Sequence, residues 1–180
     1  MDDTDRIPLL LKALRFAAYK HRDQRRKDPR TTPYINHPIE VAEIISRIGG
    51  INDTDVLCGA ILHDTIEDTQ TTPEEIEREF GTAILRIVLA VTDDKLLPKE
   101  TRKHLQIEHA PALSAEAKLV KLGDKICNIR DVISDPPTGW DDKRRREYVD
   151  WAGRVVDGLR GINPPLEREF DILVNKSGGF

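Results

Sequence analysis

Residues 61–69 read ILHDTIEDT, and this stretch places polar, titratable side chains directly after an apolar segment. On a helix, residues that are three, four and seven positions apart share one face. Val56, Ala60 and His63 lie on one such line, and Asp64 lies four residues after Ala60. The spacing predicts a helix whose last turn points His63 and Asp64 toward the interior of a helical protein.

If that helix continues, Glu67 and Asp68 extend the same face by one turn, because they lie four residues beyond His63 and Asp64. A buried group of carboxylates costs free energy unless a cation compensates it. A divalent metal would do so, since His offers a neutral nitrogen and Asp an anionic oxygen. The other interpretation is a core histidine followed by solvated acids, and this stretch alone leaves both open.

Two distant segments favour the metal. TPYINHPIEVAEII places His37 at the start of a helix, and KLVKLGDKICNIRD places Asp124 on one line with Val120 and Asn128. An aspartate among Leu and Ile is rare without a partner. Two nitrogens and two oxygens suit Mn²⁺, Fe²⁺, Co²⁺ or Zn²⁺ better than Mg²⁺ or Ca²⁺. The predicted ligands are His37, His63, Asp64 and Asp124.

The rest of the chain predicts an all-α fold. Its 180 residues suit a single domain, 1–180, with a core from about 7 to 175. Strand-like alternation never persists, while apolar periodicity and capping residues recur. Asn36, Asp53, Thr72 and Ser114 are the expected caps, with Glu75 completing a capping box after Thr72. The expected helices span 8–22, 36–48, 53 onward, 72–81, 82–92, 98–109, 114–132, 141–160 and 164 onward.

The composition limits the possible partners and the cellular compartment of the protein. A third of the residues are charged and the formal net charge is −4, which argues against a general nucleic-acid binder. No apolar run approaches the roughly 20 residues that span a bilayer. Cys58 and Cys127 are far apart and form no CxxC pair, so free thiols in a cytoplasmic protein are expected. Trp140 and Trp151 fit either a core or a homodimer interface, and the oligomeric state stays open.

Several blocks resemble one known family. HRDQRRKDPRTTPYINHP, HDTIEDT, VTDDKLLPKETRKHLQIEHAP, AKLVKLGDKICNIRD and GWDDKRRREYVDWAGRVVDGLRG occur in this order over residues 10–170. They are similar to the stand-alone hydrolases of the RelA/SpoT group, which are HD-domain phosphohydrolases. The resemblance implies an all-α HD-domain bundle that removes the 3′-pyrophosphate from (p)ppGpp, the alarmone of the stringent response. The products would be GDP or GTP and pyrophosphate, and the cofactor one Mn²⁺ per chain.

The resemblance also assigns roles to residues. It places the metal on the four ligands predicted above and makes Glu67 and Asp68 the catalytic acidic pair. Candidate contacts to the nucleotide substrate are Arg26, Lys27, Lys99, Asn128, Arg144 and Tyr148. The full-length relatives add a synthetase domain for which 180 residues leave no space, so hydrolysis alone is expected.

The sequence departs from the family at Gly123, where relatives usually have Ala, and at Cys127. Both positions lie near Asp124 and leave the preferred base open. (p)ppApp with the same chemistry and NADPH losing its 2′-phosphate are therefore alternative substrates. A module that binds the alarmone without turnover and a helical scaffold without metal are alternatives of a different class.

Overall fold

The computed structural model describes residues 6–178, which fold into helices joined by loops. Within 6–178, the extended pairing is limited to an isolated bridge between Arg25 and Pro33. The predicted all-α class is confirmed, while residues 1–5 and 179–180 of the predicted domain lie outside the described part. The elements are α1 (Arg6–Lys20), α2 (Asn36–Arg47), α3 (Thr54–Leu62), α4 (Thr65–Asp68), α5 (Pro73–Val91), α6 (Lys99–His109), the 3₁₀ turn η2 (Ala110–Ala112), α7 (Ala115–Ser134), α8 (Asp142–Asp157) and α9 (Pro164–Ser177).

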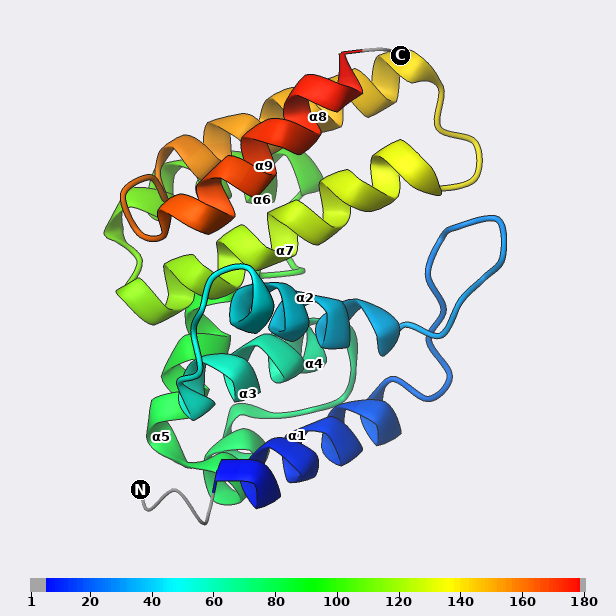
Figure 1. Cartoon of the computed structure of the whole chain (residues 1–180). Coiled ribbons are helices and arrows are strands. Elements are labelled where there is room, and N and C mark those ends of the chain that lie inside the picture. Colours follow the sequence, from blue (N-terminus) through cyan, green and yellow to red (C-terminus); the bar gives the residue numbers. More distant parts are fainter. Residues whose placement is uncertain (1–5, 179–180) are drawn as a thin grey trace.

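Helix α7 lies at the centre of the bundle. It packs against α2, α3 and α5 on one side and against α8 and α9 on the other, and Figure 1 shows it crossing the middle of the molecule. Its buried residues include Leu119, Leu122, Ile126 and Ile129, which do not follow a single narrow stripe. A helix that is apolar on several sides belongs inside a protein. Asp124 lies in the interior because α7 does.

Local signals explain most helix starts. The Asp53 side chain accepts hydrogen bonds from the backbone N–H groups of Asp55 and Val56, and Thr72 and Ser114 cap α5 and α7 in the same way. Asn36 is not a cap, because Ile35 occupies the N-cap position of α2 and no side chain caps it. The capping box is also incomplete, since the Glu75 carboxylate accepts from Lys20 Nζ at 2.6 Å.

The predicted break at Gly81 is present as a kink inside α5. Gly81 has a φ of 83°, which L side chains rarely adopt, so the chain changes direction there. The segment ILHDTIEDT is also interrupted, because α3 ends at Leu62 and α4 begins at Thr65. His63 and Asp64 occupy the short turn between these two helices.

Two glycines allow helices to approach closely. A Cβ atom on Gly123 would lie 2.9 Å from Ile45 Cγ1, so the glycine brings α7 close to α2, the helix that carries His37. A Cβ atom on Gly59 would lie 2.6 Å from Ile87 Cγ2, so α3 and α5 also meet at a glycine. Gly123 stands where relatives usually have Ala, and it therefore allows close packing of α2 and α7, the two helices that carry the predicted ligands His37 and Asp124.

We expect the substitution Gly59→Ala to destabilise the protein by about 1–2 kcal/mol, because overpacking against Ile87 exceeds the helix propensity that Ala adds. The matched control is Gly153→Ala in α8, where the added Cβ has no neighbour within 4 Å in residues 6–178 apart from the adjacent residues and the backbone of its own helix. That variant should gain about 0.5–1 kcal/mol from propensity alone. Urea unfolding monitored by circular dichroism measures both, and a stabilised Gly59→Ala variant would contradict the close packing of α3 on α5.

Two loops frame one side of the bundle. The segment 21–35 joins α1 to α2, and the segment 135–141 joins α7 to α8. The backbone N–H of Thr138 donates to the carbonyl of Lys27 at 2.9 Å and ties the loops together, and both project from the same side in Figure 1. Within residues 6–178, every helix is too short or too polar to cross a membrane.

Candidate metal and substrate site

The structure brings the four predicted metal ligands together. His63 Nε2 lies 3.0 Å from Asp64 Oδ2, and His37 Nε2 lies 3.2 Å from Asp124 Oδ1. The crossed pairs, His37 with Asp64 and His63 with Asp124, are both 3.9 Å apart. Metal–ligand bonds of about 2.0–2.2 Å place neighbouring ligands roughly 3.0–3.5 Å apart. His37, His63 and Asp124 each offer a ligand atom within 4.8 Å of the others, which fits one divalent ion, and Asp64 lies beside His63 at the edge of this cluster.

The hydrogen bonds of His63 prepare it to be a ligand. Its Nδ1 lies 2.7 Å from the carbonyl oxygen of Ala60, which holds a proton on Nδ1 and leaves Nε2 as the nitrogen available to a metal. Among residues 6–178, this buried Nε2 has no hydrogen-bond partner. Burial alone would lower the pKa of His63, yet the Asp64 and Asp124 carboxylates raise it to about 9. The site thus attracts positive charge to the position where a metal would sit.

Each aspartate ligand is held by neighbouring side chains. Asp124 accepts from Asn128 Nδ2 at 2.5 Å and from Lys125 Nζ at 3.0 Å, and Tyr34 donates its hydroxyl to Asp64 Oδ2 at 2.6 Å. Burial alone would raise the pKa of Asp124, but the Lys125 ammonium and His37 hold it well below its usual value. Both carboxylates are therefore ionised and oriented for a cation.

The ligands line a cavity of about 140 Å³, here called the metal cavity. Glu67 and Asp93 also line it, as do Lys121 and Lys125. Glu67 is fixed on one oxygen by the backbone N–H of Asp93 at 3.0 Å, and Arg102 Nη1 lies 3.7 Å from the other. Burial raises the pKa of Glu67 above its usual value. A carboxylate with a raised pKa next to a metal site can accept a proton near neutral pH.

A larger cavity of about 550 Å³ adjoins the metal cavity, and the two share Tyr34 and Asn128. Of the predicted substrate contacts, Arg26, Lys27, Asn128 and Tyr148 line this large cavity. Trp140 lies beside Tyr148, with ring centroids 5.5 Å apart, and completes an aromatic wall. The volume and the mixture of aromatic and basic side chains suit a nucleotide-sized ligand.

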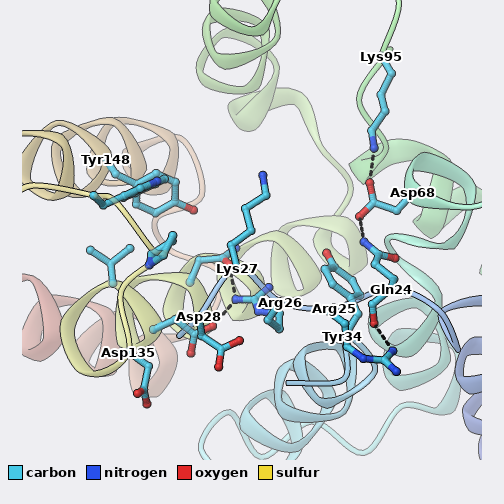
Figure 2. Close-up of a pocket in the computed structure, with 15 residues that line it drawn as sticks. Gln24, Arg25, Arg26, Lys27, Asp28, Tyr34, Asp68, Lys95, Asp135 and Tyr148 are labelled. Atoms are coloured by element: carbon cyan, nitrogen blue, oxygen red, sulfur yellow. Dashed lines mark hydrogen bonds and ion pairs between the residues drawn. The ribbon is translucent and has the colours of Figure 1, made fainter. Parts of the chain in front are cut away.

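Figure 2 shows how polar side chains line the large cavity. On one side, Asp68 accepts from Gln24 Nε2 at 2.8 Å and pairs with Lys95, which forms a chain from three segments. Tyr148 lies on the opposite side, with Arg26 between the two. Arg26 pairs with Asp131 and donates to Asn128 Oδ1 at 3.3 Å.

The predicted site residues do not all lie together. Glu67 faces the metal cavity, whereas Asp68 lines the large cavity, so the two predicted catalytic carboxylates point to different places. Lys99 is exposed at the start of α6 and lines neither cavity. Arg144 is also exposed, and its guanidinium lies 4.6 Å from the ring centroid of Trp140 at the edge of the large cavity.

Sequence reasoning missed several residues that line the two cavities, among them Gln24, Tyr34, Lys95 and Lys125. Tyr34 and Lys95 lie in loops, where no periodicity indicates direction. Lys125 follows Asp124 directly, and a buried lysine beside a buried aspartate is a signal that could have identified it. Cys127 is fully buried and, like Gly123, lines neither the metal cavity nor the large cavity.

Comparisons with known proteins agree with this geometry. A family model described as HD domain matches residues 13–149. The guanosine-3′,5′-bis(diphosphate) 3′-pyrophosphohydrolase MESH1 of Xenopus tropicalis is 57% identical, and the match covers 94% of this chain and 95% of that protein. The human MESH1 protein is 54% identical, with 94% of each chain covered.

A solved structure of a metazoan orthologue of SpoT, described as hydrolysing ppGpp and as playing a role in starvation responses, matches with a TM-score of 0.92 and 48% identity. The match covers 96% of this chain and 97% of that one. A structure of lmo0812 from Listeria monocytogenes matches with a TM-score of 0.65 and 28% identity, covering 78% of this chain and 97% of the other. These matches show that the chain belongs to the HD-domain family and, within it, to the group that contains the animal MESH1 proteins, and the geometry of the predicted ligands agrees with this.

Proposed function

We propose that the protein hydrolyses the 3′-pyrophosphate of ppGpp and pppGpp and releases GDP or GTP and pyrophosphate. The observation that carries this proposal is the cluster of His37, His63 and Asp124, with Asp64 beside it at His–Asp distances of 3.0 and 3.9 Å, next to a cavity large enough for a nucleotide. The relatives named for this activity match along almost the whole chain, which supports the same assignment.

We propose Mn²⁺ as the metal, held by His37, His63, Asp64 and Asp124. The mixed nitrogen and oxygen ligands favour a transition metal over Mg²⁺ or Ca²⁺. When bound, such an ion supplies a lowered pKa for a nearby water and positive charge for phosphate oxygens. The two cysteines are free and buried, which fits the reducing cytoplasm that we expect for the enzyme.

In the proposed reaction, the side chains of the protein bind the substrate and move a proton. The aromatic wall of Trp140 and Tyr148 packs against the base, and Arg26 and Lys27 offer charged donors to phosphate. Glu67 takes a proton from the attacking water. The water oxygen forms a bond to phosphorus, the bond from phosphorus to the 3′ oxygen breaks, and that oxygen receives a proton. One water is consumed for each GDP and pyrophosphate formed.

The test is a panel of ppGpp, ppApp and NADPH offered to purified protein with Mn²⁺ and with the metal removed by a chelator. We expect ppGpp to yield equal amounts of GDP and pyrophosphate with Mn²⁺ and no product after chelation. Product formation from ppApp or NADPH with none from ppGpp would replace the substrate assignment. Tight binding of ppGpp without any product would favour a binding module.

A further inference from the structure

A further cavity adjoins the metal cavity on a different side from the large cavity. This side cavity has a volume of about 220 Å³ and shares Val91, Asp93, Gln106 and Lys121 with the metal cavity. It shares no residue with the large cavity. The three cavities therefore form a row with the metal ligands in the middle. A water molecule needs only about 10–15 Å³ of such space, so the side cavity has room for a larger group.

Hydrogen-bond donors without partners gather where the side cavity meets the metal cavity. Lys121 is 7% exposed, and in residues 6–178 its ammonium donates to one acceptor, the carbonyl of Val91 at 3.1 Å. An ammonium group has three donors, so two are unused. The Nε of Arg102 is also buried without a partner. Buried donors are rarely left unsatisfied, so we expect these donors to bind an acceptor from outside the chain.

The acidic groups around the side cavity are already engaged. Asp93 accepts from Gln106 Nε2 at 2.6 Å, and Asp94 accepts from the backbone N–H of Leu96 at 2.9 Å. Glu67 accepts from the backbone N–H of Asp93. The carboxylates thus have donors of their own within the chain, whereas Lys121 and Arg102 keep unused donors. A ligand with negative charge and several acceptor oxygens would match these unused hydrogen-bond donors.

We propose that the end of the side cavity next to the metal ligands is a subsite for the pyrophosphate group, in which Lys121 and Arg102 donate hydrogen bonds to its outer phosphoryl oxygens. This inference rests on the proposed function. The volumes of the cavities indicate which part of the substrate each one holds, since ligand pockets usually measure about 300–1,000 Å³. The large cavity at about 550 Å³ accommodates a nucleoside, and the side cavity at about 220 Å³ is too small for one.

The test compares two product inhibitors of ppGpp hydrolysis at a fixed concentration of free Mn²⁺. Pyrophosphate would occupy the subsite, and GDP, which has no 3′ phosphate, would occupy only the large cavity. For Arg102→Met we expect the inhibition constant of pyrophosphate to rise about tenfold or more, because a charge-assisted hydrogen bond is lost. The inhibition constant of GDP should stay within about twofold. Lys121→Met should show the same pattern where this buried substitution folds.

The matched control is Arg86→Met, since Arg86 is exposed on α5 and lines none of the three cavities. Its two inhibition constants should equal those of the parent protein. Arg102 also lies near Glu67, so a purely positioning role would lower kcat while pyrophosphate inhibited the variant as it does the parent; that result overturns the subsite. Equal rises for pyrophosphate and GDP overturn it too. Absence of ppGpp turnover in the parent would instead refute the proposed function.

Discussion

The Asp124→Asn variant should bind almost no divalent metal and should lose at least about a thousandfold in kcat. The metal contributes several kcal/mol to the proposed reaction, and each 1.36 kcal/mol is a factor of ten in rate. Asp124 is the ligand with the most neighbours, because His37, Lys125 and Asn128 all approach its carboxylate. An amide of the same shape keeps the volume but removes the negative charge that offsets Lys125 and the ion.

Elemental analysis of the purified variant gives metal content, and initial rates with ppGpp give turnover. Asp150→Asn is the matched control, because Asp150 is an exposed carboxylate on α8 and lines neither the metal cavity nor the large cavity. It should keep full metal content and activity. Stoichiometric metal in Asp124→Asn together with turnover within tenfold of the parent would show that the four-residue cluster is not the working metal site.

The helices could be predicted from sequence because their signals are local. Apolar residues recur with helical spacing, and caps such as Asp53 and Ser114 bond to backbone groups only two or three residues away. The capping box predicted at the start of α5 is incomplete for a tertiary reason, because Glu75 bonds to Lys20 across the bundle. A partner 55 residues away in the chain leaves no trace in a local pattern.

The metal ligands could be proposed because polar residues interrupt lines that are otherwise buried. His63 follows Val56 and Ala60, and Asp124 follows Val120, so each side chain points inward wherever its helix is packed. The surroundings of the ligands were not predictable in this way. Tyr34, which holds Asp64, lies in the segment between α1 and α2, and the direction of a loop residue depends on the path of the whole loop.

The different positions of Glu67 and Asp68 follow from helix geometry. Adjacent residues on a helix are separated by about 100° and do not face each other. In the short helix α4, Glu67 therefore faces the metal cavity while Asp68 faces Gln24 and Lys95. That Glu67 and Asp68 act as one catalytic pair stays a prediction, and their separation allows the two residues to be tested apart. Similarly, the resemblance supplied the residue types Lys99 and Arg144, but Lys99 lines neither cavity, whereas Arg144 lies at the edge of the large cavity beside Trp140.

This separation makes Glu67→Gln a sharp test of the base. The amide keeps the size of the side chain and can still accept from the backbone N–H of Asp93, so the fold should persist. It cannot take a proton from water. General base catalysis contributes about 10²–10⁴-fold, and kcat should fall by that factor. Because Glu67 is not among the proposed metal ligands, metal content should equal that of the parent, unlike the result expected for Asp124→Asn.

Asp68→Asn is the comparison variant from the same helical turn. It weakens the contacts with Gln24 and Lys95 in the large cavity, so we expect KM for ppGpp to change more than kcat. The opposite outcome, a large loss of kcat in Asp68→Asn with turnover within tenfold of the parent in Glu67→Gln, would transfer the role of base to Asp68.

The pH dependence of kcat/KM provides a second measurement of the same residue. Burial raises the pKa of Glu67 above its usual 4.5. A general base works only in its deprotonated form, so the rate of the parent should fall as the pH drops through this raised pKa. The residual activity of Glu67→Gln should lack that acidic limb, because an amide does not titrate. If the limb persists in the variant at the same pH, another group accepts the proton, and the metal cavity offers Asp93 as the next carboxylate to replace.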